Sequence, residues 1–260
     1  MSKTCMDVNV IYDGTWAGLL TTVFETYEHR WDVKAIRSYD KPGQQDVFTQ
    51  ETEVITDPVK AARVWKGLQC KVPAAASRHL YCCYLSEQGG VERVILSCIQ
   101  FYFSGVKDPH LAYANNDVLR ITQLAKSVDR ERHRMKAFIR FQRVDDDVYY
   151  AGVEPDFNVL PLIIDHFRDR YADQRWLIYD LKRKYGIYYD LNTVEEVSVA
   201  FSEGLNKGSA VHAVFHESEQ LYQDLWKDYF RYINISERKN MKLHLQHVPR
   251  RYWGRLTEKG

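Results

Sequence analysis

The fold is decided by residues 131–190, ERHRMKAFIRFQRVDDDVYYAGVEPDFNVLPLIIDHFRDRYADQRWLIYDLKRKYGIYYD. Side chains at 136–144 alternate between two faces, a period of two that predicts a half-buried strand. The acidic triplet 145–147 breaks this run, and residues 148–153 form a second β-rich run. Two such runs separated by three polar residues favour a hairpin.

The second half of this stretch predicts a helix between strands. Leu160, Ile163, Ile164 and Phe167 recur at helical spacing, and β-rich runs follow at 176–181 and 187–190. Residues 136–190 therefore predict a central β-β-α-β-β unit. Its helix must cover one face of the sheet, which leaves the other face for the rest of the chain or for a ligand.

The chain on either side of this unit is mainly helical in pattern. A strand at 8–12 and a helix at 16–29 are joined by the turn Asp13-Gly14-Thr15, which can also cap the helix. A helical block follows at about 57–135, and further helices are expected at about 217–258. We expect the α+β class and, because no linker or repeat interrupts the chain, a single compact domain over residues 1–260.

Composition limits the class of protein. The net charge of +1 selects neither nucleic acid nor membrane, although local charge can. No run of about 18 apolar residues and no apolar leader is present, so we expect no membrane span and no signal peptide. The five cysteines contain no CxxC pair, which favours a reducing cytoplasm.

Positive charge is concentrated in two segments. The junction before the central unit carries six basic residues against Glu131 alone, and the tail from Ser236 is also rich in Lys and Arg. Basic side chains suit a phosphate backbone, and Tyr252 and Trp253 could add stacking faces. The alternative is a solvated helix face with internal ion pairs. The six basic residues of the junction are Arg130, Arg132, Arg134, Lys136, Arg140 and Arg143.

Acid–base chemistry has four candidates in the central stretch. His133 and His166 lie beside arginines, whose charge keeps a histidine neutral and suits it to act as a base. Glu154 and Asp180 could complete an acid–base set, but nothing fixes their mutual geometry. A histidine that is merely hydrogen-bonded in the core is the alternative. We expect no metal site, because His212 and His216 have no third ligand at a fixed spacing. We also expect no cofactor.

Four blocks resemble a bacterial family of unknown function whose members are labelled as DNA metabolism or DNA repair proteins. They are YDGTWAGLL (12–20), RHRMKAFIRF (132–141), YYAGVEPDFNVLPLIIDHFRDRYADQRWLIYD (149–180) and LWKDYFRYINISERKNMKLHLQHVPRRYWGRLTE (225–258). Members of this family are encoded beside a DNA-repair radical-SAM protein, and some are fused to a uracil-DNA-glycosylase-like domain. This chain is similar to the stand-alone form.

The resemblance implies an accessory role in DNA modification or repair, with DNA and a radical-SAM protein as partners. Any radical chemistry would belong to the partner, because this chain lacks the CxxxCxxC motif. The matched blocks supply the candidate nucleic-acid-binding residues, namely Arg134, Arg140, Arg170, Arg238, Asn240, Arg251 and Trp253. Two alternatives stay open: an enzyme that acts on a damaged base or nucleotide with His133 or His166 as acid–base, and a protein-interaction module without DNA affinity. The oligomeric state also stays open.

Overall fold

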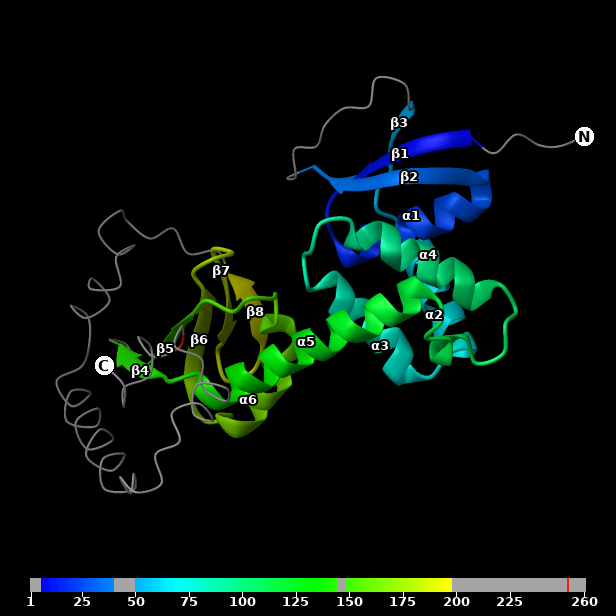
Figure 1. The fold of residues 1–260 in the computed structure, drawn as a ribbon. Helices are drawn as coiled ribbons and strands as arrows, with labels where there is room; N and C mark the ends of the chain where they lie inside the picture. Colours follow the sequence, from blue (N-terminus) through cyan, green and yellow to red (C-terminus); the bar gives the residue numbers. More distant parts are fainter. Residues whose placement is uncertain (1–5, 40–49, 145–147, 198–251, 253–260) are drawn as a thin grey trace, which may run out of the picture. The chain divides into compact units, whose positions relative to one another are not determined.

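The computed structural model describes residues 6–39, 50–144, 148–197 and 252. The chain divides into two compact units, Met1–Asp129 and Arg130–Gly260, and each is described by itself. The expected α+β class is confirmed, because each unit combines helices with its own sheet (Figure 1). A single domain over residues 1–260 stays a prediction, and the helices expected at about 217–258 lie outside the described residues.

The first unit is built on a small parallel sheet. Its strands are β1 (Met6–Tyr12), β2 (Trp31–Ser38) and β3 (Gln50–Glu53), in the order β2-β1-β3. The predicted helix is confirmed as α1 (Trp16–His29), which connects β1 to β2. Thr15 caps α1 by accepting a hydrogen bond from the Gly18 amide at 2.9 Å, and Gly14 turns the chain ahead of it with φ +79°.

The predicted helical block is confirmed. It consists of α2 (Pro58–Lys71), α3 (Ala74–Tyr84), α4 (Val91–Phe103), the short 3-10 helix η1 (Pro109–Leu111) and α5 (Asn116–Phe138). Asp57 caps α2, and Pro58 is tolerated in the first turn because no donor is lost there. Helix α5 begins in the first unit and ends in the second.

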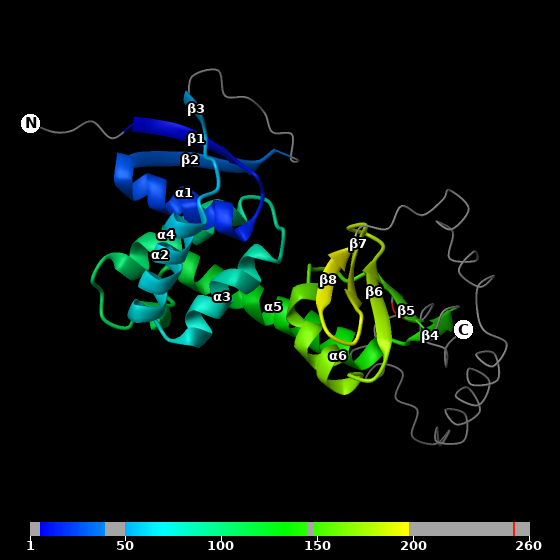
Figure 2. The same cartoon turned by 180° about the vertical axis from the view of Figure 1, so that it is seen from behind.

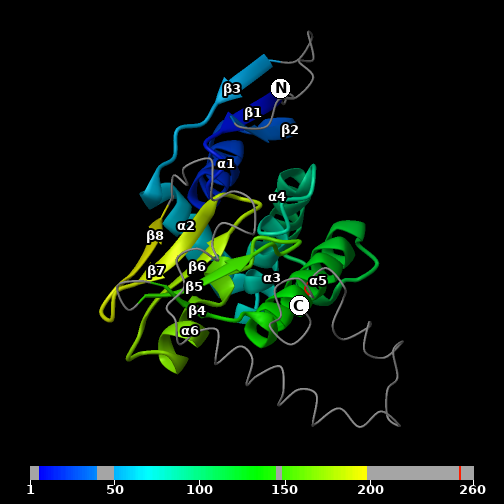
Figure 3. The same cartoon turned by 90° about the vertical axis from the view of Figure 1, so that its left-hand side faces the viewer.

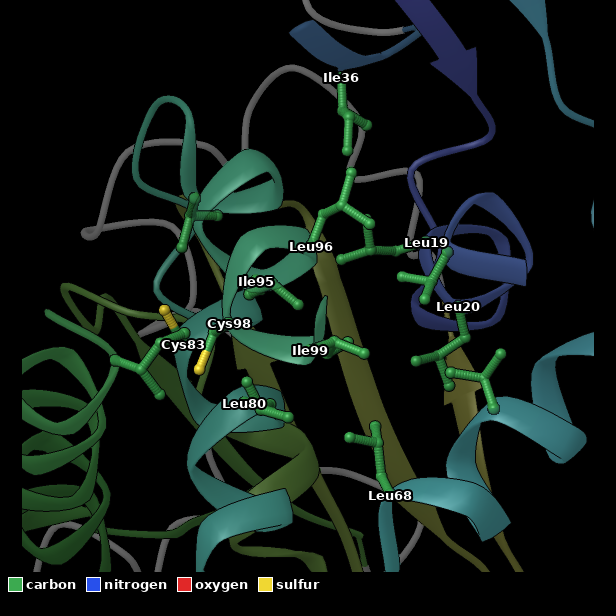
Figure 4. Close-up of a cluster of buried hydrophobic side chains, with 14 of the residues drawn as sticks. Leu19, Leu20, Ile36, Leu68, Leu80, Cys83, Ile95, Leu96, Cys98 and Ile99 are labelled. Carbon is green, nitrogen blue, oxygen red and sulfur yellow. The ribbon is translucent and has the colours of Figure 1, made fainter. Parts of the chain in front are cut away.

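The core of the first unit lies between the sheet and these helices. Helices α1 and α4 pack on the same side of the sheet, as the two opposite views in Figures 1 and 2 show. Leu19, Leu68 and Ile95 converge there from three different helices (Figure 4). Cys83 and Cys98 are part of this core, where burial raises the pKa of each thiol to about 12.

The second unit confirms the predicted β-β-α-β-β order and adds a fifth strand. Figure 3 shows the sheet in the order β4-β5-β6-β7-β8, with α6 beside it. Strands β4 and β5 form the expected antiparallel hairpin, whereas β5 and β6 are parallel and are joined through α6. The bounds are β4 (Gln142–Val144), β5 (Val148–Val153), η3 (Leu160–Leu162), α6 (Ile164–Arg170), β6 (Arg175–Asp180), β7 (Tyr185–Tyr189) and β8 (Val194–Val197).

The prediction of a strand over residues 136–144 is wrong in its first part. Helix α5 runs on to Phe138, and only Gln142–Val144 pairs as a strand. The reason is a buried stripe at helical spacing, formed by Glu131, Met135 and Ile139. Burial of this stripe favours a helix over the strand that the short alternation predicts. No helix in the described part of the chain is long and apolar enough to cross a membrane.

An aromatic cluster fills the core of the second unit. Phe141 meets Phe167 edge-on at 5.6 Å between ring centroids, and Trp176 lies 5.5 Å from Tyr189. Phe167 comes from α6 and Trp176 from β6, so the cluster joins the helix to the sheet.

Candidate nucleic-acid interface

The carboxyl ends of β5 and β6 bring two of the candidate acid–base residues to one edge of the sheet. Val153 is paired with Asp180 across these parallel strands, and Glu154 directly follows Val153. Glu154 is exposed, whereas Asp180 is completely buried. The two carboxylates therefore lie on neighbouring strands but in different environments.

Asp180 holds the turn between β6 and β7. Its Oδ1 accepts hydrogen bonds from the amides of Lys182 at 2.9 Å and Arg183 at 3.0 Å. Its Oδ2 accepts a hydrogen bond from Arg183 Nη1 at 2.8 Å. Because both oxygens are engaged in a fully buried site, these contacts assign Asp180 a structural function.

Arg183 connects this turn to the loop that follows β5. Its Nη1 donates to the Pro155 carbonyl at 3.1 Å, and its Nη2 donates to the Asp156 carbonyl at 3.2 Å. The planar guanidinium can hold Asp180 and both carbonyls at the same time, since its donors point in fixed directions. The two strand ends are thus fastened to each other through one side chain.

Glu131 fastens the same loop to α5. Its side chain is buried, and Oε1 accepts hydrogen bonds from the Asp156 amide at 3.0 Å and from the Tyr252 hydroxyl at 2.5 Å. Arg134 Nη1 lies 3.5 Å from Oε2. Glu131 is not among the residues singled out from the sequence, because it appears there only as the one acidic residue among six basic ones. Its spacing of four from Met135 is the signal that marks it as buried.

Tyr252 is buried rather than presented as a stacking face. Only 5% of its surface is exposed, and its ring lies 5.4 Å from that of Phe138 at an angle of 42°. The sequence-based expectation that Tyr252 stacks on a base is therefore wrong. The phenol is held inside because its hydroxyl has a carboxylate partner and its ring has an apolar one.

A small pocket opens beside Tyr252. Its volume is about 20 Å³, and its lining includes Phe138, Arg140, Gly152 and Glu154. A cavity needs roughly 10–15 Å³ to hold one water molecule, so this pocket admits a water but no nucleobase. Arg140 also closes α5, because its Nη1 donates to the carbonyls of Ala137 at 2.7 Å and Ile139 at 3.3 Å.

Two cationic side chains, one on α5 and one on α6, act on a histidine of α6. We call Lys136, His166 and Arg170 the basic cluster. His166 is half-buried, and burial followed by the positive charges of Lys136 and Arg170 lowers the pKa of its imidazole below the ordinary value. Asp169 acts in the opposite direction without reversing the shift. Both cations thus help to keep this imidazole neutral.

The two arginines of α6 differ in their partners. Arg170 is exposed, and its guanidinium lies over the Tyr171 ring at 5.7 Å from the centroid. Arg168 instead pairs with Asp165 at 2.9 Å and with Asp169 at 3.3 Å. Arg170 is therefore oriented by an aromatic face, whereas the charge of Arg168 is balanced by carboxylates.

The remaining candidates are scattered. His133 is exposed on α5, and Arg134 is half-buried beside Glu131. His166 belongs to the basic cluster and so does not share its site with Asp180, whose oxygens bind the β6–β7 turn. The candidates Arg238, Asn240, Arg251 and Trp253 lie outside the described residues.

One group in the described part of the chain has metal-ligand spacing. Glu25, Glu28 and His29 on α1 bring ligand atoms within 4.8 Å of one another. Lys60 donates to Glu25 at 2.6 Å and to Glu28 at 2.9 Å, so an ammonium already bridges these carboxylates. The group is explained by this ion-pair network between α1 and α2.

Comparison with known proteins gives one family match. Residues 90–258 match the family model described as a domain of unknown function, DUF4130. The match begins just before α4 and includes Glu131, the basic cluster and Tyr252. No curated protein matches the chain.

Proposed function

The chain belongs to the family of the domain of unknown function DUF4130, and from this premise we propose that it is an accessory protein of DNA modification or repair that binds nucleic acid through the basic cluster. The cluster lies within the matched residues. Arg170 is exposed, Lys136 and His166 are half-buried, and positive charge of this kind is what a phosphate group neutralises.

The observation that carries this proposal is that the positive charges of Lys136 and Arg170 both act on His166. Burial lowers the pKa of His166 most, and repulsion between these two positive charges and a proton on the imidazole lowers it further. A bound phosphate would relieve this repulsion, and each neutralised phosphate would release counterions into the solvent. The exposed guanidinium of Arg170 also offers the fixed donor geometry that suits phosphate oxygens.

The resemblance supports the rest of the proposal. The family of the four sequence blocks is encoded beside a radical-SAM protein, and we propose such a protein as the partner of this chain in the cytoplasm. In that arrangement this chain would hold the nucleic acid, and the partner would supply the radical chemistry.

The experiment is binding of the full chain to fluorescent single- and double-stranded DNA across a salt series. We expect the logarithm of the affinity to fall linearly with the logarithm of salt, with a slope of about −0.9 per neutralised duplex phosphate and about −0.7 per single-strand phosphate. Arg170→Ala should weaken binding and make the slope shallower by about one such unit. Lys136→Ala should do the same.

Arg168→Ala is the matched control. It removes an arginine from the same helix, but one whose charge is already balanced by Asp165 and Asp169. It should leave the slope unchanged. No binding at low salt, or equal losses in Arg168→Ala and Arg170→Ala, would refute the basic cluster as the interface.

A further inference from the structure

The outward face of α2 combines exposed apolar side chains with exposed positive charge. We propose that this face is a docking surface for an acidic segment of a partner protein, one that carries aliphatic side chains between its carboxylates. The inference goes beyond the proposed function, because α2 lies in the first unit and the basic cluster lies in the second. Helix α2 also lies outside the residues that match the family model.

Helix α2 has one face in the core and one face in the solvent. The core face consists of Ala61, Val64 and Leu68, which are buried. The outward face consists of Val59, Ala62, Arg63 and Lys66, which are exposed. Positions three and four apart share one side of a helix, so the four outward side chains form one continuous strip.

An open hollow of about 390 Å³ lies on this strip, and its described lining consists of Pro58, Val59, Ala62, Arg63 and Lys66. Val59 is 69% exposed, and Ile55, just before the helix, is 82% exposed. All of these lining residues belong to one helix, so they form a floor without an opposite wall. A small molecule would stay largely in water there, whereas a partner with its own apolar surface would bury both surfaces.

Arg63 and Lys66 make this face positive. In the part of the chain that the structure describes, no carboxylate forms an ion pair with either side chain. Lys60, on the flank of the helix, differs because it binds two glutamates of α1 at 2.6 Å and 2.9 Å. Arg63 acts on one of them, Glu28, only through its charge, and its guanidinium lies over the Phe24 ring at 5.0 Å from the centroid.

The apolar lining decides which anionic partner fits. Helix α2 carries no acidic residue, so its exposed cations attract anions of several classes. A nucleic acid would neutralise the cations through its phosphates, but it would leave Val59 and Ala62 without an apolar contact. A bilayer takes up helices whose apolar face carries large side chains, and this face has only valine and alanine. An acidic protein segment supplies carboxylates and an aliphatic side chain together.

The test is a nuclear magnetic resonance titration of the full chain with three synthetic helical peptides. The first consists of glutamate and leucine, with the leucines at helical spacing. The second has lysine in place of glutamate, and the third has serine in place of leucine. We expect the glutamate–leucine peptide to shift the amide signals of Val59, Ala62 and Lys66. The serine peptide should bind at least about tenfold more weakly, because it buries no leucine, and the lysine peptide should not bind this face.

Charge reversal is the second part of the test. Arg63→Glu combined with Lys66→Glu should abolish binding of the glutamate–leucine peptide and create binding of the lysine–leucine peptide. Both side chains are exposed, so the fold should be kept, and far-ultraviolet circular dichroism checks this. Lys71→Glu is the matched control, because it reverses a charge on the same helix at a position that does not line the hollow. It should leave the preference for the acidic peptide unchanged.

Four outcomes would overturn the proposal. They are no shift with the glutamate–leucine peptide, equal shifts with the lysine–leucine peptide, a double variant that keeps the acidic preference, and shifts of these amides only with duplex DNA or with phosphatidylserine vesicles. The last outcome would assign the face to a nucleic acid or to a membrane instead. The double variant should also keep the salt slope of DNA binding, so failure of this surface and failure of the basic cluster can be distinguished.

Discussion

The Tyr252 hydroxyl donates a hydrogen bond of 2.5 Å to Glu131 Oε1, across 121 positions of sequence. Both side chains are buried, so the bond is shielded from water. Together with the ring contact to Phe138, it fastens Tyr252 to α5. The same carboxylate holds the loop after β5. Glu131 therefore links α5, that loop and Tyr252.

Tyr252→Phe should lower the free energy of unfolding by about 1.5–3 kcal/mol. The change keeps the ring against Phe138 and removes only a hydrogen bond to a charged group. Urea unfolding of the full chain measures it. Tyr27→Phe is the control, because Tyr27 is 48% exposed and should change stability by less than about 0.5 kcal/mol. Equal effects of the two substitutions would contradict the importance of the Glu131 contact.

Arg183→Ala should destabilise the second unit by about 3–5 kcal/mol, because it leaves the buried Asp180 carboxylate without its charged partner. A matched pair provides the control. Arg168 and Asp165 have the same spacing of three but lie on the surface, with 45% and 82% of their side chains exposed. Arg168→Ala should cost at most about 1 kcal/mol. Urea midpoints read from the fluorescence of the buried Trp176 measure both losses of stability. Similar losses in Arg183→Ala and Arg168→Ala would contradict a structural function of Asp180.

His166 should make stability depend on pH. Its pKa is lowered in the folded state, so the unfolded chain binds the proton more tightly. Stability should therefore fall as pH drops through the ordinary value of 6.5 toward the folded pKa, and stay level above 6.5. Urea midpoints between pH 8 and pH 5 measure this slope. His166→Asn should reduce it.

Titration by nuclear magnetic resonance identifies the cause of that shift. Lys136→Met should raise the pKa of His166 toward its ordinary value, because it removes one of the two positive charges that lower it. Lys184→Met, a change to an exposed lysine in the β6–β7 turn, should not. An unchanged pKa in Lys136→Met would show that α5 and α6 do not form one basic cluster.

Arg140→Ala should lower stability by about 1 kcal/mol and leave the salt slope of DNA binding unchanged. The guanidinium donates to two carbonyls at the end of α5, where a positive charge also compensates the helix dipole. Thermal unfolding and the salt series together decide the point. A shallower slope with unaltered stability would instead assign Arg140 to the phosphate contacts.

Two glycines in helices should respond oppositely to alanine. A Cβ at Gly18 would lie 2.2 Å from Asp13 Oδ1 and 2.7 Å from Thr56 Oγ1, so Gly18→Ala must disturb the turn before α1 and cost about 1–3 kcal/mol. At Gly67 the nearest atom is 3.5 Å away, and Gly67→Ala should stabilise α2 by about 0.5–1 kcal/mol. Melting temperatures that shift in the same direction would contradict this contrast.

Local sequence patterns were enough for most elements. The turn Asp13-Gly14-Thr15 marks the start of α1, and Asp57 with Pro58 marks the start of α2, because caps act within three residues. The predicted strand at 136–144 is wrong in its first part, because α5 runs on to Phe138. Alternation over a few residues competes there with a helical stripe that begins at Glu131, and burial favours the stripe.

The candidate site was less predictable than the fold. Lys136, His166 and Arg170 could be singled out as basic residues, but only the packing of α6 beside α5 brings their charges together. The partners of Glu131 are 25 and 121 positions away, and no local period connects them. The sequence made Asp180 a catalytic candidate. Its complete burial and its contact with Arg183, which indicate a structural function, cannot be read from the sequence.

The order of strands in the second unit also has a consequence for the order of folding. Strands β4 to β8 lie side by side in the order in which they are synthesised, so each can pair with the strand made just before it. Such near-neighbour pairings close short loops and form early, whereas the bond between Tyr252 and Glu131 closes a long one. Tyr252 should thus reach Glu131 only after the neighbouring strands of this sheet have paired.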